Sequence, residues 1–215
     1  MLHSFVASCV IPVPERSVSA VRSSPPQERS ALLSEARECA IEAHEGQTRR
    51  AGWAPYVQHP LAVAGVIDEA GFDAEVVAAA LLHDVVEKTA IGLDELERSF
   101  GPRVAELVSV LTEDGSLSAY LARKEEHRRR VQAADESAAA IYAADKLCNV
   151  REVRGLYERE GEDVARRLKA PLDVRIELWR GDLQMLTERA PGIPFLVDLA
   201  LELREFDAQR AGQAA

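Results

Sequence analysis

Residues 74–88 read AEVVAAALLHDVVEK, and the fold is interpreted outward from this stretch. Its middle, residues 76–82, is apolar on nearly all sides when it is wound into a helix. A helix that is apolar all round is usually buried at the centre of a bundle. The stretch therefore predicts one continuous helix over residues 74–88, with other helices packed on several of its sides.

On both sides of this stretch, apolar residues recur at intervals of three and four, which is the spacing of one helix face. The low aromatic content of 5% and the plentiful alanine also favour helices over sheets. No run alternates between apolar and polar residues, and no internal repeat is found. The sequence predicts an all-α fold, a compact multi-helix bundle. We expect the flanking helices at residues 30–46, 59–71, 93–100, 102–111, 117–134, 136–153, 173–189 and 194–209.

Residues 1–28 differ from the rest of the chain, because they are rich in proline and serine and show no helical period. We expect a disordered leader there and a single domain over residues 29–212 of this 215-residue chain. The apolar stripe over residues 193–203, together with Trp179, either completes the bundle or forms a contact in a homodimer.

The charge balance limits the classes of partner. The chain has 26 Lys and Arg residues against 36 Asp and Glu residues, a formal net charge of −10. This balance argues against nucleic acid and against a basic membrane-surface protein, although a small anionic substrate stays open. The mixed run over residues 123–130 is interpreted as a solvated helix face. Three scattered cysteines without a CxxC pair fit a cytoplasmic protein, and no apolar run is long enough for a membrane helix.

The strongest chemical signal is His83-Asp84 at the end of the apolar stretch. Burying ionisable groups in such surroundings costs free energy unless they are paired or bind a metal. The alternative to a metal site is a structural pair in which His83 and Asp84 bind only each other. Glu87 lies on the same flank of the predicted helix. His59 and Asp145 stand in two other predicted helices, and Asp145 also interrupts an apolar run. Two imidazoles and two carboxylates form a mixed N/O set suited to Mn, Fe, Mg or Zn, with room left for water or a phosphate oxygen.

Several longer strings make the pattern more specific. They are AHEGQTR at residues 43–49, PYVQHP at 55–60, AALLHDVVE at 79–87, FGPRV at 100–104 and ADKLCN at 144–149. Together they resemble the hydrolase domain of RelA/SpoT-type enzymes, which belong to the HD-domain metal-dependent phosphohydrolases. The resemblance covers about residues 30–157. The closest likeness is to the stand-alone small alarmone hydrolases, because no synthetase domain fits in the remaining length.

The resemblance implies a Mn²⁺-dependent hydrolase that removes the 3′-pyrophosphate of (p)ppGpp and leaves GDP or GTP. It implies that the metal is held by His59, His83, Asp84 and Asp145. Glu87 would orient or deprotonate the attacking water. The residues implied to contact the nucleotide are Arg49 and Arg50 on the guanine base, Asn149 on the nucleoside, and Lys146 and Arg123 on phosphate.

Lys88 is the chief departure from the family pattern, which continues HDVVED where this chain reads HDVVEK. A cation thus replaces an acidic catalytic partner, and three interpretations stay open. Lys88 contacts a substrate phosphate and changes the specificity, or it weakens hydrolysis and leaves a nucleotide-binding regulatory module, or a nearby acid such as Asp94 or Glu95 substitutes. The alternative substrates are an adenosine alarmone and the 2′-phosphate of NADPH.

Overall fold

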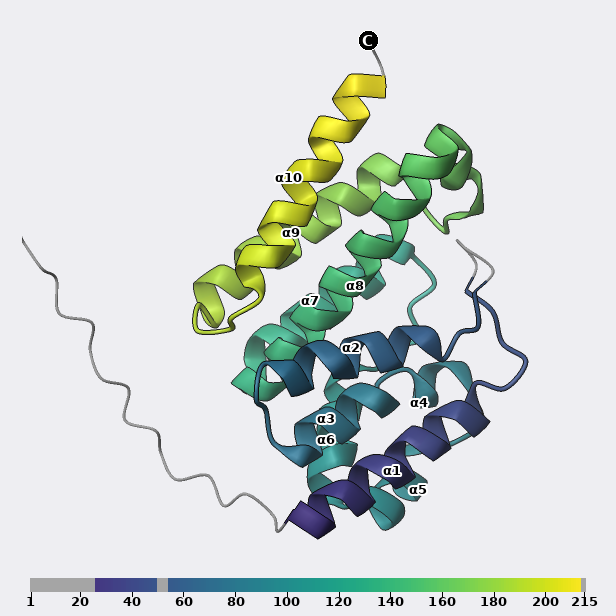
Figure 1. The fold of residues 1–215 in the computed structure, drawn as a ribbon, viewed down its shortest axis with the longest axis vertical. Coiled ribbons are helices and arrows are strands. Elements are labelled where there is room, and N and C mark those ends of the chain that lie inside the picture. Colours follow the sequence, from purple (N-terminus) through teal and green to yellow (C-terminus); the bar gives the residue numbers. More distant parts are fainter. Residues whose placement is uncertain (1–25, 50–53, 214–215) are drawn as a thin grey trace, which may run out of the picture.

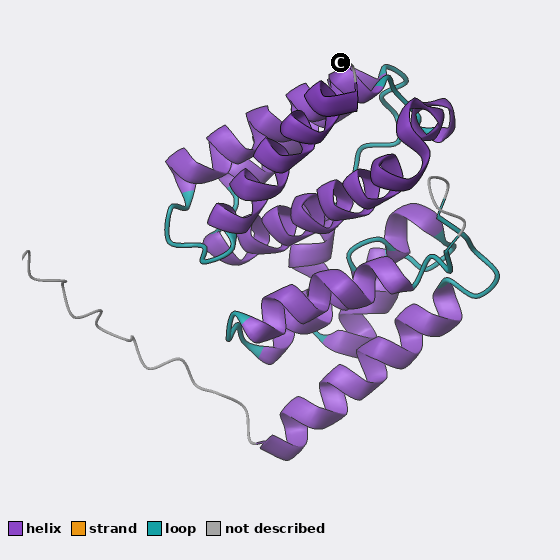
Figure 2. Cartoon of the chain, turned by 45° about the horizontal axis from the view of Figure 1, so that its top comes forward, coloured by secondary structure: helices purple, strands orange, loops and turns teal. Residues whose placement is uncertain are grey.

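The computed structural model describes residues 26–49 and 54–213, and this part of the chain contains helices and loops but no strand (Figure 2). An isolated antiparallel bridge between Thr48 and Pro55 is its only extended pairing. The all-α prediction is confirmed. No helix among the described residues is long and apolar enough to cross a membrane. The helices are α1 (Pro26–Ala43), α2 (Gln58–Glu69), α3 (Ala74–Leu82), α4 (Val85–Lys88), α5 (Leu93–Phe100), α6 (Pro102–Leu111), α7 (Tyr120–Ala133), α8 (Glu136–Glu160), η1 (Gly161–Arg167), α9 (Leu172–Arg189) and α10 (Leu196–Gln213).

Helix α3 lies at the centre of the first half of the bundle, where α1, α2 and α6 pack on it. Its side chains from Val76 to Leu82 are all buried, as the apolar pattern predicts. The three consecutive alanines in this helix let its neighbours approach closely. Long helix α8 packs on α2 and is covered on its other side by α10 (Figure 1). Both halves contribute to one continuous apolar core.

The prediction of one continuous helix over residues 74–88 is wrong at His83 and Asp84. Helix α3 ends at Leu82, and the one-turn helix α4 begins at Val85. The His83 ring is hydrogen-bonded to the Ala80 carbonyl oxygen, and Asp84 takes up φ −97° and ψ −9°, in the bridge region of backbone space. The side chains of both residues at the break line the same cavity.

Other bounds differ from the prediction for local reasons. Helix α1 begins at Pro26, so residues 26–28 of the expected leader are helical, and the rest of that leader lies outside the described residues. Helix α7 begins at Tyr120 rather than at residue 117, because the Asp114 side chain accepts a hydrogen bond from the Ser116 backbone and holds a turn there. Helix α8 continues past the predicted end at residue 153 to Glu160.

The apolar stripe over residues 193–203 completes the bundle. Ile193, Leu196, Leu199 and Leu203 are buried within the chain, and so is Trp179. Val197 and Leu201, on the outer side of α10, are exposed. The buried side chains of the stripe therefore complete the bundle, which is the first of the two roles expected for it.

Candidate metal centre

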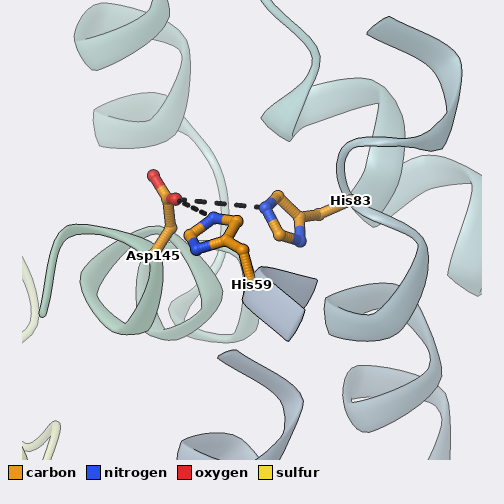
Figure 3. A group of neighbouring side chains, drawn as sticks. All are labelled: His59, His83 and Asp145. Atoms are coloured by element: carbon orange, nitrogen blue, oxygen red, sulfur yellow. Dashed lines mark hydrogen bonds and ion pairs between the residues drawn. The ribbon is translucent and has the colours of Figure 1, made fainter. Parts of the chain in front are cut away.

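Three side chains from separate segments of the chain converge inside the bundle. His59 lies in the first turn of α2, His83 directly follows α3, and Asp145 lies midway along α8. Both imidazoles point toward the Asp145 carboxylate (Figure 3). The Asp145 Oδ1 atom lies 2.9 Å from His59 Nε2 and 3.9 Å from His83 Nε2. One donor atom from each residue lies within 4.8 Å of the other two, which is close enough for one ion to reach all three.

The surroundings of His83 leave one ring nitrogen free to bind. Its Nδ1 atom lies 2.7 Å from the Ala80 carbonyl oxygen, so Nδ1 carries the proton and donates. Its Nε2 atom is buried and has no hydrogen-bond partner among the described residues. Metal-binding histidines usually donate one ring N–H to a carbonyl or carboxylate oxygen, so that the other ring nitrogen can bind the ion. His83 has this arrangement, because Nδ1 donates to a carbonyl oxygen and Nε2 faces the carboxylates.

Asp84 adds a second carboxylate at the edge of this group. Its Oδ2 atom lies 3.5 Å from His83 Nε2 and 4.0 Å from His59 Nε2. The Tyr56 hydroxyl donates a hydrogen bond of 2.7 Å to the same oxygen and so fixes its direction. The sequence alone assigns no role to Tyr56, although this residue lies in the PYVQHP string three residues before His59.

The charge states of these groups suit a divalent cation. Burial alone would raise the pKa of Asp145, but the Lys146 ammonium and the His59 hydrogen bond hold this pKa well below its ordinary value. Burial also opposes ionisation of Asp84, but its neighbours His83 and Lys88 hold its pKa below its ordinary value. Burial lowers the pKa of His59, so this imidazole is neutral at pH 7. Neutral imidazoles and ionised carboxylates are the forms that bind metal ions, so the four residues fit the expected group.

Glu87 and Lys88 both line the cavity that contains this group. The Lys88 ammonium forms an ion pair with the Glu87 carboxylate, and it lies 3.9 Å from Asp84 Oδ1. Asp94 and Glu95 lie on α5, and neither lines this cavity. Of the two carboxylates paired with Lys88 among the described residues, Asp84 belongs to the convergent group, and Glu87 is already bound to the ammonium.

Arg49 reaches the cavity from the loop before α2. Its Nε atom lies 3.0 Å from Glu152 Oε2, and its Nη2 atom donates to Asn149 Oδ1 at 2.8 Å. The guanidinium also lies over the Tyr56 ring, 5.5 Å from its centroid. Arg50, predicted with it as a base contact, lies outside the described residues. Arg49 is thus held in one orientation at the cavity wall by partners from α8 and by Tyr56.

The two α8 residues expected to contact the nucleotide are bonded to Asp145. Lys146 is buried, and its ammonium donates to Asp145 Oδ2 at 2.6 Å. The Asn149 side-chain amide donates to Asp145 Oδ1, also at 2.6 Å. Both residues line the cavity. In this structure both side chains contact Asp145 and orient its carboxylate.

The cavity has a volume of about 230 Å³ and a cation-rich wall. Its lining includes eight Lys or Arg residues against six Asp or Glu residues, in a chain that is acidic as a whole. Arg123, predicted as a phosphate contact, lines the cavity and donates to the carbonyl oxygens of Leu117 and Ser118. The local excess of positive charge favours an anionic ligand.

Comparison with known families shows to which family the chain belongs. The model of the HD domain matches residues 36–172, which is more than half of the chain. The chain belongs to the HD-domain family.

Named relatives carry this HD domain within larger proteins. A "probable guanosine-3′,5′-bis(diphosphate) 3′-pyrophosphohydrolase" from Synechocystis is 36% identical over 149 residues, covering 66% of this chain and 20% of that protein. A "guanosine-3′,5′-bis(diphosphate) 3′-pyrophosphohydrolase" from Aquifex aeolicus is 35% identical over 152 residues, covering 68% and 22%. The chain therefore spans about a fifth of the length of these curated relatives.

Two solved structures match the HD domain at nearly their full length. The crystal structure of lmo0812 from Listeria monocytogenes superposes with a TM-score of 0.63 at 32% identity, covering 68% of this chain and 96% of that one. A metazoan ortholog of SpoT, described as hydrolysing ppGpp, superposes with a TM-score of 0.66 at 29% identity, covering 87% and 98%. Both are similar to this chain in fold and at the level of sequence.

The HD domain also has cavity residues to which the sequence assigns no role in the site. His127 is one of them and is buried, so the prediction of a solvated helix face over residues 123–130 is wrong at this residue. These cavity residues come from the loop after α6, from α7, and from the segment around η1 and α9. No spacing pattern joins them to the histidines, so only the folded chain brings them to the cavity wall. They are Glu113, Tyr120, Lys124, His127, Arg167, Lys169, Arg175 and Asp182.

His127 gives the HD domain a titratable group with a large effect on stability. Burial first and the Lys146 charge second lower its pKa to about 3, and neither ring nitrogen has a hydrogen-bond partner among the described residues. An unfolded histidine binds a proton near pH 6.5, so between this pH and pH 3 the unfolded state holds more protons. We expect this group to lower the free energy of unfolding by about 1.4 kcal/mol per pH unit as the pH falls below about 6.5.

The measurement is urea unfolding of wild type and of His127→Gln from pH 7 to pH 5. His59, whose pKa burial also lowers, contributes in the same direction in both proteins. The variant should therefore show a shallower pH dependence, whatever its stability at pH 7. Equal slopes in the two proteins would contradict the prediction.

Proposed function

We propose that this HD domain is a Mn²⁺-dependent hydrolase that removes the 3′-pyrophosphate of (p)ppGpp. The observation that carries the proposal is the convergence of two imidazoles and a carboxylate in a cavity with a cation-rich wall. The names given to the Synechocystis and Aquifex relatives and to the metazoan structure support the same substrate. We assign the activity to a single domain over residues 29–212.

The residues that would hold the metal are His59, His83, Asp84 and Asp145. Their mixed nitrogen and oxygen donors suit Mn²⁺ or a similar divalent transition ion. When bound, such an ion polarises a phosphate oxygen and lowers the pKa of a bound water. Lys146 and Asn149 would keep Asp145 oriented, and Tyr56 would do the same for Asp84.

The other residues of the proposed site act in proton transfer and in substrate binding. Glu87 would take a proton from the attacking water, whose oxygen forms a bond to the phosphorus bonded to the ribose 3′ oxygen. The bond between this phosphorus and the 3′ oxygen breaks, and the 3′ oxygen takes up a proton. Arg49, held by Glu152 and Asn149, would pack its guanidinium plane on the guanine base, and Arg50 is proposed to assist it. Arg123 and Lys146 supply positive charge for the phosphates.

A second candidate function is a nucleotide-binding regulatory module with slow turnover. The ion pair between Lys88 and Glu87 favours it, because a carboxylate bound to an ammonium is a weaker base. The substrate would bind in the same cavity in both cases. The two candidates differ only in the rate of hydrolysis.

The deciding experiment is a panel of nucleotides incubated with Mn²⁺-loaded protein. Release of pyrophosphate from ppGpp, with GDP as the other product, supports the proposed function. Release of phosphate from NADPH, or turnover of an adenosine alarmone but not of ppGpp, assigns the activity to another purine nucleotide. Binding of ppGpp without turnover supports the regulatory module.

We also propose that the protein acts in the cytoplasm, where a nucleotide of this kind would be met. Cys39 and Cys148 are free thiols in the structure, as expected in a reducing compartment. Burial raises the pKa of Cys148 to about 12, so this thiol beside the site stays protonated and unreactive.

A further inference from the structure

A buried carboxylate on α9 lies behind the candidate metal centre. Asp182 is only 4% exposed, and its Oδ1 atom accepts hydrogen bonds from the Tyr142 hydroxyl at 2.9 Å and from Arg128 Nε at 2.7 Å. Arg128 also donates to the Leu178 carbonyl oxygen at 2.9 Å. A Cβ atom at Gly181 would approach the Arg128 guanidinium to 3.2 Å, so the absence of a side chain there makes room for this pair.

The network continues from Tyr142 toward the metal centre along one face of α8. The Lys146 ammonium lies 3.9 Å from the centroid of the Tyr142 ring, one helical turn away. An ammonium over an aromatic face is attracted by the ring, and more strongly where water is excluded. Tyr142 and Lys146 are 1% and 6% exposed, so this contact is largely shielded from bulk solvent. The hydrogen bond to Asp182 fixes the ring on which Lys146 lies.

Lys146 in turn sets the direction of Asp145. Its ammonium binds Asp145 Oδ2, while Asn149 and His59 contact Oδ1. The carboxylate is thereby turned so that Oδ1 faces both imidazoles. Groups that orient a ligand in this way change the metal affinity as well as the activity.

We propose that Asp182 is a positioning residue of the metal centre, which holds Tyr142 and, through it, the Lys146 ammonium that orients Asp145. Nearly all of α9, Asp182 included, follows the matched HD-domain residues, which end at 172. The C-terminal part of this chain therefore supports the centre as well as closing the bundle. The inference rests on the proposed function, because it requires that the four-residue group binds a metal.

The test is the affinity of metal-free protein for Mn²⁺, measured from the electron paramagnetic resonance signal of the unbound ion. Tyr142→Phe keeps the ring under Lys146 but removes its hydrogen bond to Asp182, and Asp182→Asn removes the charge. We expect each variant to raise the Kd for Mn²⁺ by roughly 10-fold. The double variant should lose about as much as one single variant, because both changes act through the same contact.

The matched control is Asp207→Asn, which makes the same chemical change in the exposed pair that Asp207 forms with Arg180. We expect it to leave the Kd for Mn²⁺ unchanged. All proteins are compared at a temperature where circular dichroism shows them folded, since a purely structural role would lower the melting temperature without changing the Kd. If Asp182→Asn does not fold, Tyr142→Phe alone decides.

The outcomes separate the two proposals. A Kd that is unchanged in the folded variants overturns the role of Asp182 and leaves the proposed function standing. Wild-type protein that binds no Mn²⁺ overturns the proposed function and this inference with it. A weakened affinity in Tyr142→Phe but not in Asp207→Asn supports the inference.

Discussion

Replacement of His83 by alanine is expected to abolish both Mn²⁺ binding and hydrolysis of ppGpp. The variant loses the buried Nε2 atom that faces Asp84 and Asp145 and has no partner among the described residues. If the lost ion supplied about 4 kcal/mol of transition-state stabilisation, the rate should fall by about 10³-fold. The measurements are metal content by elemental analysis and release of pyrophosphate.

His44→Ala serves as a matched control for the removal of a buried imidazole. His44 is 2% exposed and packs on Tyr56, but it does not belong to the convergent group. We expect it to retain one Mn²⁺ ion per chain and to lose stability instead. If His83→Ala binds Mn²⁺ as tightly as wild type, the proposed ligand set is wrong.

The substitution Lys88→Asp is expected to increase kcat for ppGpp. In wild type the Lys88 ammonium binds the Glu87 carboxylate and lies close to Asp84, so it competes for the charges that the reaction needs. A carboxylate at this position releases Glu87 to act as a base. Because general base catalysis contributes roughly 10²–10⁴-fold, we expect a gain of at least about 10-fold in kcat, measured at saturating substrate.

Lys88→Met separates the effect of the missing ammonium from the effect of the added carboxylate. Under the proposal, it should give a rate between those of wild type and Lys88→Asp. If both substitutions instead raise KM and lower kcat together, Lys88 is a phosphate contact in a site of different specificity. The prediction that it restrains Glu87 would then be wrong.

The sequence predicts the helices well where packing against the core dictates them. Residues 93–100 and 102–111 were expected as helices and are found with those bounds, because their apolar spacing and their flanking glycines act locally. The break at His83 was missed. It depends on a side-chain contact with the Ala80 carbonyl oxygen, and no periodic pattern carries that information.

The metal-binding set of the candidate site was predictable from the sequence, but the contacts that hold it were not. The apolar neighbours of His83 and Asp145 indicate these two residues, and His59 joins them through the pattern of the PYVQHP string. Their partners follow from long-range packing instead. Arg49 meets Glu152 across 103 residues of sequence, and Tyr142 meets Asp182 across 40. Such pairs form only when α8 is packed against the rest of the bundle, so local spacing says nothing about them.

Because the converging residues come from α2, from the position after α3 and from α8, a bound ion would also affect the stability of the fold. His59 and Asp145 are 86 residues apart in sequence, so one ion bound to both would act as a cross-link between distant segments of the chain. A ligand that binds only the folded state stabilises it by about 2.7 kcal/mol at a free concentration of 100 times its Kd. The supply of metal in the cell would then affect the stability of the folded protein as well as its rate of turnover.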